Sequence, residues 1–292
     1  SAAAAAQALI DALAAQQTQT LDVDQVRSIA RDVAETVALE LIDGAVRPVV
    51  IQIPDVGDFK IAEQTHRDFE RVCRMVGVGV HPMLVGPAGT GKSTLAHQVA
   101  NALQRPFGAI SLHPQMAASQ LFGFIDASGT YRGTPFRECY EQGGVFLFDE
   151  IDNGHPGVLA GINQALANGE CAFADGMVKR HDDFVAIAAA NTFGTGPNAQ
   201  YVGRNQLDAA TLDRFARVEL LLDEKLETSL VRAVLDEEPA HAWLATVRAM
   251  RANVDRGALR VIVSPRTSIE GAKLIRAGFT PREAADAKVL SG

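Results

Sequence analysis

The sequence predicts an α/β fold with a mainly parallel sheet, followed by a smaller domain made of helices. Short apolar runs typical of buried strands alternate with helical stretches across residues 47–222. A glycine-rich turn interrupts this pattern after residue 85, between an apolar run and a helical stretch. Beyond residue 222 the apolar spacing is helical only. We therefore expect two folded domains, 47–222 and 223–292, after a helical N-terminal extension over residues 1–46.

The N-terminal extension is predicted from composition and periodicity. It contains no proline and one glycine, Gly44. After an alanine-rich start, apolar residues recur at helical spacing: Val26, Ile29, Val33 and Val37. The alanine-rich stretch is a weak helix by itself, because isolated helices shorter than ~12–15 residues barely form in water. The extension should contain one weak helix and one stronger helix.

The elements of the two domains follow from apolar runs and helix start signals. Six runs are predicted as strands: 49–53, 78–85, 109–112, 145–148, 184–190 and 218–222. The stretches 64–76 and 94–103 are predicted as helices. In the C-terminal domain, Ser264-Pro265 is typical of an N-cap with proline at the first helical position, and residues 280–283 are typical of a capping box.

Composition and charge argue against several classes of protein. The longest unbroken apolar stretch, 184–190, is far shorter than the ~20 residues that span a bilayer. No Lys or Arg precedes Arg27, so the basic start of a signal peptide is missing and we expect a cytoplasmic protein. The net charge of −8 argues against a surface that neutralises many nucleic-acid phosphates. The three cysteines form no CxxC pair and the histidines form no HExxH motif, which argues against a disulfide framework or a resident metal cluster.

Residues 86–94 carry the strongest chemical signal. They read Gly86-Pro87-Ala88-Gly89-Thr90-Gly91-Lys92-Ser93-Thr94 and fit the pattern G-x4-G-K-[ST] between a strand and a helix. In such a loop, small residues let successive backbone N–H groups surround phosphates at a helix N-terminus. Lys92 is expected to reach the phosphate oxygens of a nucleotide, and the Ser93 hydroxyl to ligate Mg²⁺. A glycine-rich turn without function is the alternative, and the flanking strand and helix argue against it.

Two carboxylates end the predicted strand 145–148. Asp149 and Glu150 follow four apolar residues, and adjacent acids are costly to bury unless they are paired or bind a metal. We expect Asp149 to orient Mg²⁺ through its water shell, and Glu150 to polarise the water that attacks the nucleotide.

Polar and basic residues follow the last strands. The strand 184–190 ends at Asn191, at the sheet edge where α/β proteins bind ligands. Asn191 is a candidate to hold the attacking water or the γ-phosphate, and a loop cap is its alternative role. Arg204 and Arg214 come later, with no evident helical acidic partner except Asp213. Solvated surface arginines are the alternative for both.

Five segments of the chain occur in the order found in one family. GPAGTGKST, VFLFDE, AAANT, GRNQLDAATLDRF and SPRTS span roughly residues 78–275, which resemble an AAA+ ATPase. The resemblance favours the branch of MoxR-type ATPases, magnesium and cobalt chelatase ATPase subunits, midasin and dynein. Residues 122–136 resemble the helix-2 insert of that branch, and we expect Tyr131 and Arg132 to project from it. Residues 170–187, which alternate around Asp175-Gly176, resemble the hairpin before sensor 1.

The resemblance implies a fold, cofactors and residue roles. The fold is a P-loop NTPase with a three-layer parallel sheet and a small helical lid, and the cofactors are ATP and Mg²⁺. Asn191 matches sensor 1, Arg214 matches the arginine finger given to the next subunit, and Arg266 matches the sensor-2 arginine of the lid. Arg204 matches a further nucleotide-site arginine of midasin-like members. The family also implies ATP hydrolysis by a homo-oligomeric ring, with a hexamer expected.

Three functions remain open from the sequence. The leading hypothesis is an ATP-hydrolysing ring that remodels or activates a partner protein complex, and a partner with a von Willebrand A domain is common in the family. A nucleic-acid motor or loader is the second, with the basic step 179–181 as its contact. A nucleotide-gated scaffold with poor turnover is the third, and the presence of Asp149, Glu150 and Arg214 argues against it.

Overall fold

The computed structural model describes residues 49–53, 57–61, 64–197, 201–257 and 261–290. The predicted N-terminal extension, 1–46, lies outside these ranges. Within them, no helix combines the length and the apolar character that crossing a membrane requires.

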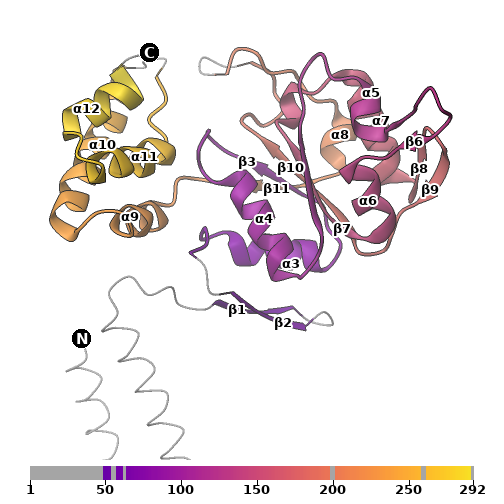
Figure 1. The fold of residues 1–292 in the computed structure, drawn as a ribbon, viewed down its shortest axis with the longest axis horizontal. Coiled ribbons are helices and arrows are strands. Elements are labelled where there is room, and N and C mark those ends of the chain that lie inside the picture. The colour runs from indigo at the N-terminus through magenta and orange to yellow at the C-terminus, as the bar shows by residue number, and fades with distance from the viewer. Residues whose placement is uncertain (1–48, 54–56, 62–63, 198–200, 258–260, 291–292) are drawn as a thin grey trace, which may run out of the picture. The chain divides into compact units, whose positions relative to one another are not determined.

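A five-stranded parallel sheet forms the centre of the α/β region (Figure 1). Its strands are β3 (Pro82–Val85), β4 (Phe107–Ser111), β7 (Gly144–Asp149), β10 (Phe184–Ala190) and β11 (Ala216–Glu219). They lie in the order β11-β3-β10-β7-β4, and Ala188 of β10 pairs with Met83 on one side and Phe148 on the other. Every residue of β10 is buried, as expected of a continuously apolar strand in a parallel sheet. The predicted parallel sheet is confirmed.

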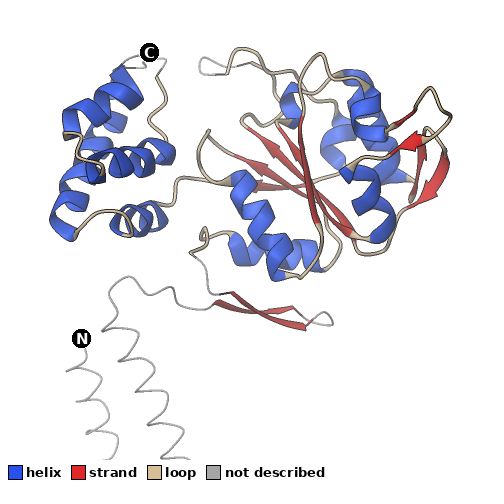
Figure 2. Ribbon diagram, in the orientation of Figure 1, coloured by secondary structure: helices blue, strands red, loops and turns tan. Residues whose placement is uncertain are grey.

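Helices cover both faces of this sheet and complete the three predicted layers (Figure 2). One face packs against α3 (Phe69–Gly77) and α4 (Lys92–Ala102), and the other packs against α5 (Ala118–Phe122), α6 (Pro135–Gln142) and α7 (Pro156–Ala167). Strand β7 shows the alternation behind this arrangement. Val145 and Leu147 join the core on the α3 and α4 side, whereas Phe146 and Phe148 join the core on the opposite side.

Strand β11 lies slightly before its predicted position at 218–222. Its partner β3 ends at Val85, where the chain turns into the loop that starts at Gly86, and the last ladder pair joins Glu219 to Val85. Leu221 lies beyond this ladder and is 50% exposed. The length of the neighbouring strand therefore sets the end of β11, not its own apolar run.

Among the described residues, three antiparallel hairpins accompany the sheet. They are β1 (Val49–Ile53) with β2 (Gly57–Ile61), β5 (Phe124–Ile125) with β6 (Tyr131–Arg132), and β8 (Glu170–Phe173) with β9 (Gly176–Lys179). The last two lie in the segments that resemble family inserts. Strand β2 was not predicted, because its alternation of polar and apolar residues covers too few positions to stand out.

Tyr131 and Arg132 were both expected to project from the first insert, but only Arg132 does so, and Tyr131 turns inward. The Tyr131 hydroxyl donates to the carbonyl of Phe122 over 3.1 Å, and its ring packs against the core. Arg132 is exposed but forms an ion pair with Asp126 at 2.6 Å. Burying the Tyr131 ring removes apolar surface from water, which explains its inward position. Two apolar side chains of this hairpin are exposed instead: Phe124 (51%) and Ile125 (45%).

Only helices follow β11 in the described part of the chain. They are α9 (Glu224–Arg232), α10 (Glu237–Gly257), α11 (Pro265–Arg276), α12 (Pro281–Ala285) and a π-helical turn (Asp286–Leu290). They enclose a core around Trp243, whose indole N–H donates to the carbonyl of Ser268 over 2.8 Å. The capping box of Thr280 and Glu283 is confirmed. Pro265 begins α11 as predicted, but the Ser264 side chain makes no cap hydrogen bond.

The domain limits at 222 and 223 stay a prediction. The α/β region and the helices belong to one compact unit, Val49–Gly292. Glu227 is buried in the helical part and pairs with Arg251 at 2.8 Å, which joins α9 to α10.

Candidate nucleotide site

The phosphate-loop sequence forms a tight turn between β3 and α4. Gly91 has φ +88° and directly precedes Lys92, the first residue of α4. Most residues with a Cβ avoid this left-handed conformation, so glycine suits the position. At Gly86 a Cβ would lie 2.1 Å from the carbonyl oxygen of Leu220, so only glycine fits beside β11. The loop therefore needs glycine at both ends of its turn.

The Lys92 ammonium is held by three oxygens at the end of the sheet. It donates to the carbonyls of Gly86 (2.7 Å) and Pro87 (2.9 Å) and to Oδ1 of Asn191 (2.9 Å). Burial lowers the pKa of Lys92 to about 8, and the nearby carboxylates of Asp149 and Asp152 oppose this shift. The ammonium thus joins the loop to the end of β10, at the place predicted for phosphate binding.

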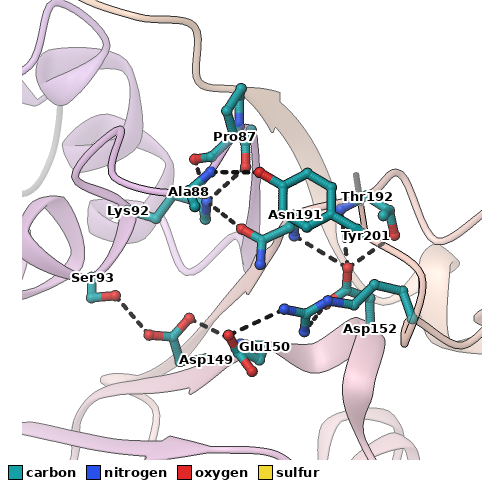
Figure 3. Close-up of polar contacts among 12 residues, drawn as sticks. Pro87, Ala88, Lys92, Ser93, Asp149, Glu150, Asp152, Asn191, Thr192 and Tyr201 are labelled. Atoms are coloured by element: carbon teal, nitrogen blue, oxygen red, sulfur yellow. Dashed lines mark hydrogen bonds and ion pairs between the residues drawn. The ribbon is translucent and has the colours of Figure 1, made fainter. Parts of the chain in front are cut away.

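Ser93 and Asp149 bring two oxygen donors together. The Ser93 hydroxyl donates to Oδ2 of Asp149 over 2.7 Å, and the Oδ1 atom of that carboxylate accepts the backbone N–H of Glu150 at 2.9 Å (Figure 3). Mg²⁺ prefers oxygen ligands, and a hydroxyl beside a carboxylate can bind it together with the phosphate oxygens of a nucleotide. The residues present therefore fit an Mg²⁺-bound nucleotide. Among the described residues, no cluster of three or more His, Cys, Asp or Glu side chains could hold a metal ion in the absence of a nucleotide.

Glu150 follows Asp149 with an unusual backbone conformation. Its φ of +53° places a non-glycine residue in the left-handed region, which is sparsely populated and often marks a functional site. This turn leads into a 3-10 helix, Ile151–Asn153. The Glu150 carboxylate pairs with Arg204 at 3.2 Å. Arg204 is only 13% exposed and has two carboxylate partners, so the solvated-surface alternative is wrong for it.

Asp152 is a buried carboxylate at this site that the sequence analysis missed. It is 0% exposed and accepts hydrogen bonds from the backbone N–H groups of Asn191 (3.2 Å) and Thr192 (3.0 Å) and from the Thr192 hydroxyl (2.9 Å). It also pairs with Arg204 at 3.3 Å. The signal in the sequence was a third acid shortly after the strand-end pair, within Asp149-Glu150-Ile151-Asp152.

A cavity of about 540 Å³ brings many of the predicted residues together. Residues 88–94 of the loop line it, as do Asp149, Glu150 and Asn191. Arg266 lines it from α11, beside Glu270 and Lys273. Several further lining residues carry no signal in the sequence: Gln64, His66, Gln98, Leu226, Leu230 and Ile269. Arg204 and Arg214 are not among the described residues that line the cavity.

Arg214 lies apart from the cavity of its own chain. It is exposed and directly follows α8 (Ala209–Asp213), where its backbone N–H donates to the carbonyl of Thr211. Asp208 caps the start of this short helix by accepting from the Thr211 N–H at 2.6 Å. The helix thus presents Arg214 to solvent.

Comparisons with known proteins show which families and proteins this chain resembles. Residues 81–215 match the family described as "AAA domain (dynein-related subfamily)". The chain is 31% identical to the aerobic cobaltochelatase subunit CobS of Sinorhizobium sp over 211 residues, which cover 65% of this chain and 64% of that subunit. It is 24% identical to the denitrification regulatory protein NirQ of Stutzerimonas stutzeri, with 70% and 76% coverage. It is 25% identical to the gas vesicle ATPase GvpN of Haloferax mediterranei, with 82% and 73% coverage.

Solved structures show a similar fold. The crystal structure of NtrX from Brucella abortus aligns with a TM-score of 0.53 at 15% identity, over 90% of this chain and 60% of that one. At this identity the match speaks for the fold alone. Residues 81–215 match the AAA domain, and the relatives include a chelatase subunit and a vesicle ATPase, so this region is an AAA+ ATPase domain similar to those of the MoxR-like and chelatase group.

Proposed function

We propose that this chain works in a ring that hydrolyses ATP with Mg²⁺ and uses the energy to remodel or activate a partner protein complex. The observation that carries the ATP-hydrolysing part is the convergence of the phosphate loop, the Asp149-Glu150 strand end and Asn191 on one cavity. The cytoplasm is the proposed compartment.

The loop and its lysine bind the nucleotide. Backbone N–H groups of residues 88–94 and the Lys92 ammonium are the donors for the phosphate oxygens. The Ser93 hydroxyl and the Asp149 carboxylate would hold Mg²⁺, which when bound offsets negative charge on the phosphates. Asn191 shares a hydrogen bond with Lys92, so its side chain is placed to hold the γ-phosphate or the attacking water.

Glu150 is the proposed base for hydrolysis. It lines the cavity next to Asp149, and a carboxylate there can accept hydrogen-bond donation from a water and increase the nucleophilicity of that water. Arg266, in α11, also lines the cavity and contributes a positive charge there. Arg214 is exposed outside the cavity of its own chain, so its role needs a neighbouring subunit.

The partner part of the proposal is supported by the relatives. Their names include a cobaltochelatase subunit, a denitrification regulatory protein, gas vesicle ATPases and a von Willebrand factor A domain-containing protein of Mus musculus. The chelatase subunit and the gas vesicle ATPase are named for larger assemblies, and one relative is named for its von Willebrand A domain, which favours a protein client or a von Willebrand A-type partner for this chain. The exposed Phe124 and Ile125 of the β5–β6 hairpin are the proposed contact.

The nucleic-acid alternative gains no support from the basic step 179–181. Arg180 donates to the carbonyl of Leu166 over 2.9 Å, and the His181 backbone N–H donates to the carbonyl of Tyr140. The Arg180 side chain is therefore tied to its own fold, and too few charges remain in this step for many phosphate contacts.

Two substitutions test the proposed roles at the ATP site. Lys92→Ala should abolish nucleotide binding, whereas Glu150→Gln should keep the ATP dissociation constant and lose turnover. Calorimetric titration measures the binding, and phosphate release measures the turnover. Lys225→Ala and Glu70→Gln, both at exposed helical positions, are the matched controls and should behave like wild type. Wild-type turnover in Glu150→Gln would refute the water-polarising role, and ATP binding without turnover in the native chain would favour the scaffold.

A further inference from the structure

Glu150 and Asp152 share one guanidinium. Arg204 Nη2 donates to Oε1 of Glu150 at 3.2 Å, and Arg204 Nη1 donates to Oδ1 of Asp152 at 3.3 Å. The exposed fractions of the three side chains fall from 39% for Glu150 to 13% for Arg204 and 0% for Asp152. The arginine therefore bridges a carboxylate at the cavity to a carboxylate inside the protein.

The two oxygens of Asp152 have separate partners. Oδ2 accepts all three donors at the end of β10, which are the N–H groups of Asn191 and Thr192 and the Thr192 hydroxyl. Oδ1 accepts the Arg204 guanidinium. The backbone carbonyl of Asp152 also accepts the N–H of Asn205 at 2.7 Å. Asp152 thus fixes the strand end that carries Asn191 and the segment that carries Arg204.

This arrangement fixes the position of the guanidinium. A buried carboxylate without a partner is strongly unfavourable, so Asp152 holds its hydrogen-bond donors firmly. A guanidinium is planar and presents donors in a fixed fork, so an arginine held at one donor has a defined direction at the other. The guanidinium therefore also fixes the position of the Glu150 oxygen that it contacts.

Arg204 contacts Glu150 away from the cavity. Glu150 lines the cavity, whereas Arg204 is not among the described residues that do so. Within the described part of the chain, Arg204 takes the Oε1 atom and leaves the Oε2 atom of Glu150 for other partners. Because Asp152 offsets the charge of Arg204, the Glu150 carboxylate does not face an uncompensated cation.

We propose that Arg204, anchored by Asp152, is a positioning residue that orients the Glu150 carboxylate toward the attacking water, and is not itself a ligand of the nucleotide. This inference rests on the proposed function, in which Glu150 polarises that water. Arg204→Ala should lower kcat on the order of 10²-fold, as expected when a catalytic group is misplaced by about 1 Å. The KM and the ATP dissociation constant should stay within about twofold, since the phosphate-loop contacts are intact.

Two further variants separate positioning from folding. Asp152→Asn can keep its oxygen on the three β10 donors while its amide group faces Arg204, which breaks only the Asp152–Arg204 contact. It should lower kcat like Arg204→Ala and keep ATP binding. Arg204→Lys keeps a cation beside Asp152 but cannot bridge two carboxylates with a planar fork, so it should keep the fold and lose most of the same kcat. Arg232→Ala, which removes an exposed ion pair with Glu237, is the control for arginine loss.

The Glu150→Gln background decides between the roles. If Arg204 acts through Glu150, adding Arg204→Ala to Glu150→Gln should not lower single-turnover hydrolysis further. The proposal would be overturned if the losses of hydrolysis rate in the two single variants multiplied in the double variant. It would also be overturned if Arg204→Ala raised the ATP dissociation constant more than about tenfold or had a faster kcat. Wild-type turnover in Glu150→Gln alone would instead be the failure of the proposed function, so the two failures are distinguishable.

Discussion

The hydroxyl of Tyr201 accepts a hydrogen bond from the backbone N–H of Ala88 at 2.9 Å (Figure 3). Ala88 belongs to the phosphate loop and lines the cavity. In loops of this type the backbone N–H groups are the donors for phosphate oxygens. A side chain from the segment after β10 therefore occupies a donor that a bound nucleotide needs.

This contact predicts that Tyr201→Phe binds ATP more tightly. A typical net hydrogen bond contributes about 1 kcal/mol, so releasing the Ala88 N–H should lower the ATP dissociation constant by about fivefold. Calorimetric titration measures it. Tyr131→Phe is the matched control, since its hydroxyl donates to the Phe122 carbonyl away from the loop. Weaker ATP binding by Tyr201→Phe would contradict the prediction and make the hydroxyl a nucleotide contact.

The lowered pKa of Lys92 predicts proton uptake when ATP binds. Burial brings this pKa to about 8, so the lysine is partly neutral at pH 8 in the free protein. Phosphate charges next to the ammonium favour its charged form and raise the pKa again. Binding at pH 8 should therefore take up a fraction of a proton, and the affinity should fall as the pH rises above 8. Calorimetry at pH 8 in two buffers with different ionisation enthalpies measures the uptake.

Lys92→Arg supplies the comparison for this titration. Arginine keeps its charge throughout this pH range, so whatever affinity the variant retains should not fall between pH 8 and pH 9. Equal binding enthalpies of the native chain in both buffers would show that Lys92 is already fully charged before ATP arrives.

The helical part of the structure predicts the effect of Gly271→Ala. A Cβ at Gly271 would lie 2.1 Å from the Trp243 ring. Alanine normally stabilises a helix by about 1 kcal/mol over glycine, but overpacking a core costs roughly 1–3 kcal/mol. The variant should therefore lose up to about 2 kcal/mol of unfolding free energy in urea. Gly157→Ala, whose nearest neighbour is the exposed His155 side chain, should show no such loss. Equal stability of Gly271→Ala would mean that the Trp243 ring shifts freely.

Several site residues could be predicted from the sequence because strand geometry determines where they lie. Asp149 and Asn191 end neighbouring parallel strands, β7 and β10, so their positions at one sheet edge could be expected from two apolar runs. Gly91 and Lys92 could be placed because the loop pattern fixes where the helix begins. In both cases a short local sequence pattern is enough to predict the position of the residue.

The contacts of Asp152 and Tyr201 could not be predicted in the same way. The Tyr201 hydroxyl meets Ala88 across 113 positions of sequence, and no periodic pattern links them. Asp152 turns inward only because Glu150 takes a left-handed conformation and the next residues form a 3-10 turn. Tyr131 was expected to project for a similar reason, since a short insert does not reveal which side of its hairpin packs on the core. Tertiary packing decides such positions.

The position of Arg214 predicts that activity needs two adjacent subunits. It is exposed after α8 and lies outside the described lining of its own cavity, so a finger role requires the cavity of a neighbour. Such fingers contribute roughly 10³–10⁵-fold in rate. Arg214→Ala and Lys92→Ala should each be inactive alone, the first without its finger and the second without its phosphate loop.

Mixing the two inactive variants should restore activity. In a ring assembled at random from equal amounts, about a quarter of the interfaces join an intact phosphate loop to an intact Arg214, so up to about a quarter of the native rate is expected. Phosphate release after co-refolding or subunit exchange measures the recovery. A chain carrying both substitutions, mixed with Lys92→Ala, is the control and should stay inactive because no interface has an intact phosphate loop. The native rate per subunit should also fall on dilution, since separated subunits cannot share the arginine. A rate per subunit that stays constant on dilution would show that activity needs no ring. A mixture that recovers no activity would show that the arginine finger is another residue of the chain.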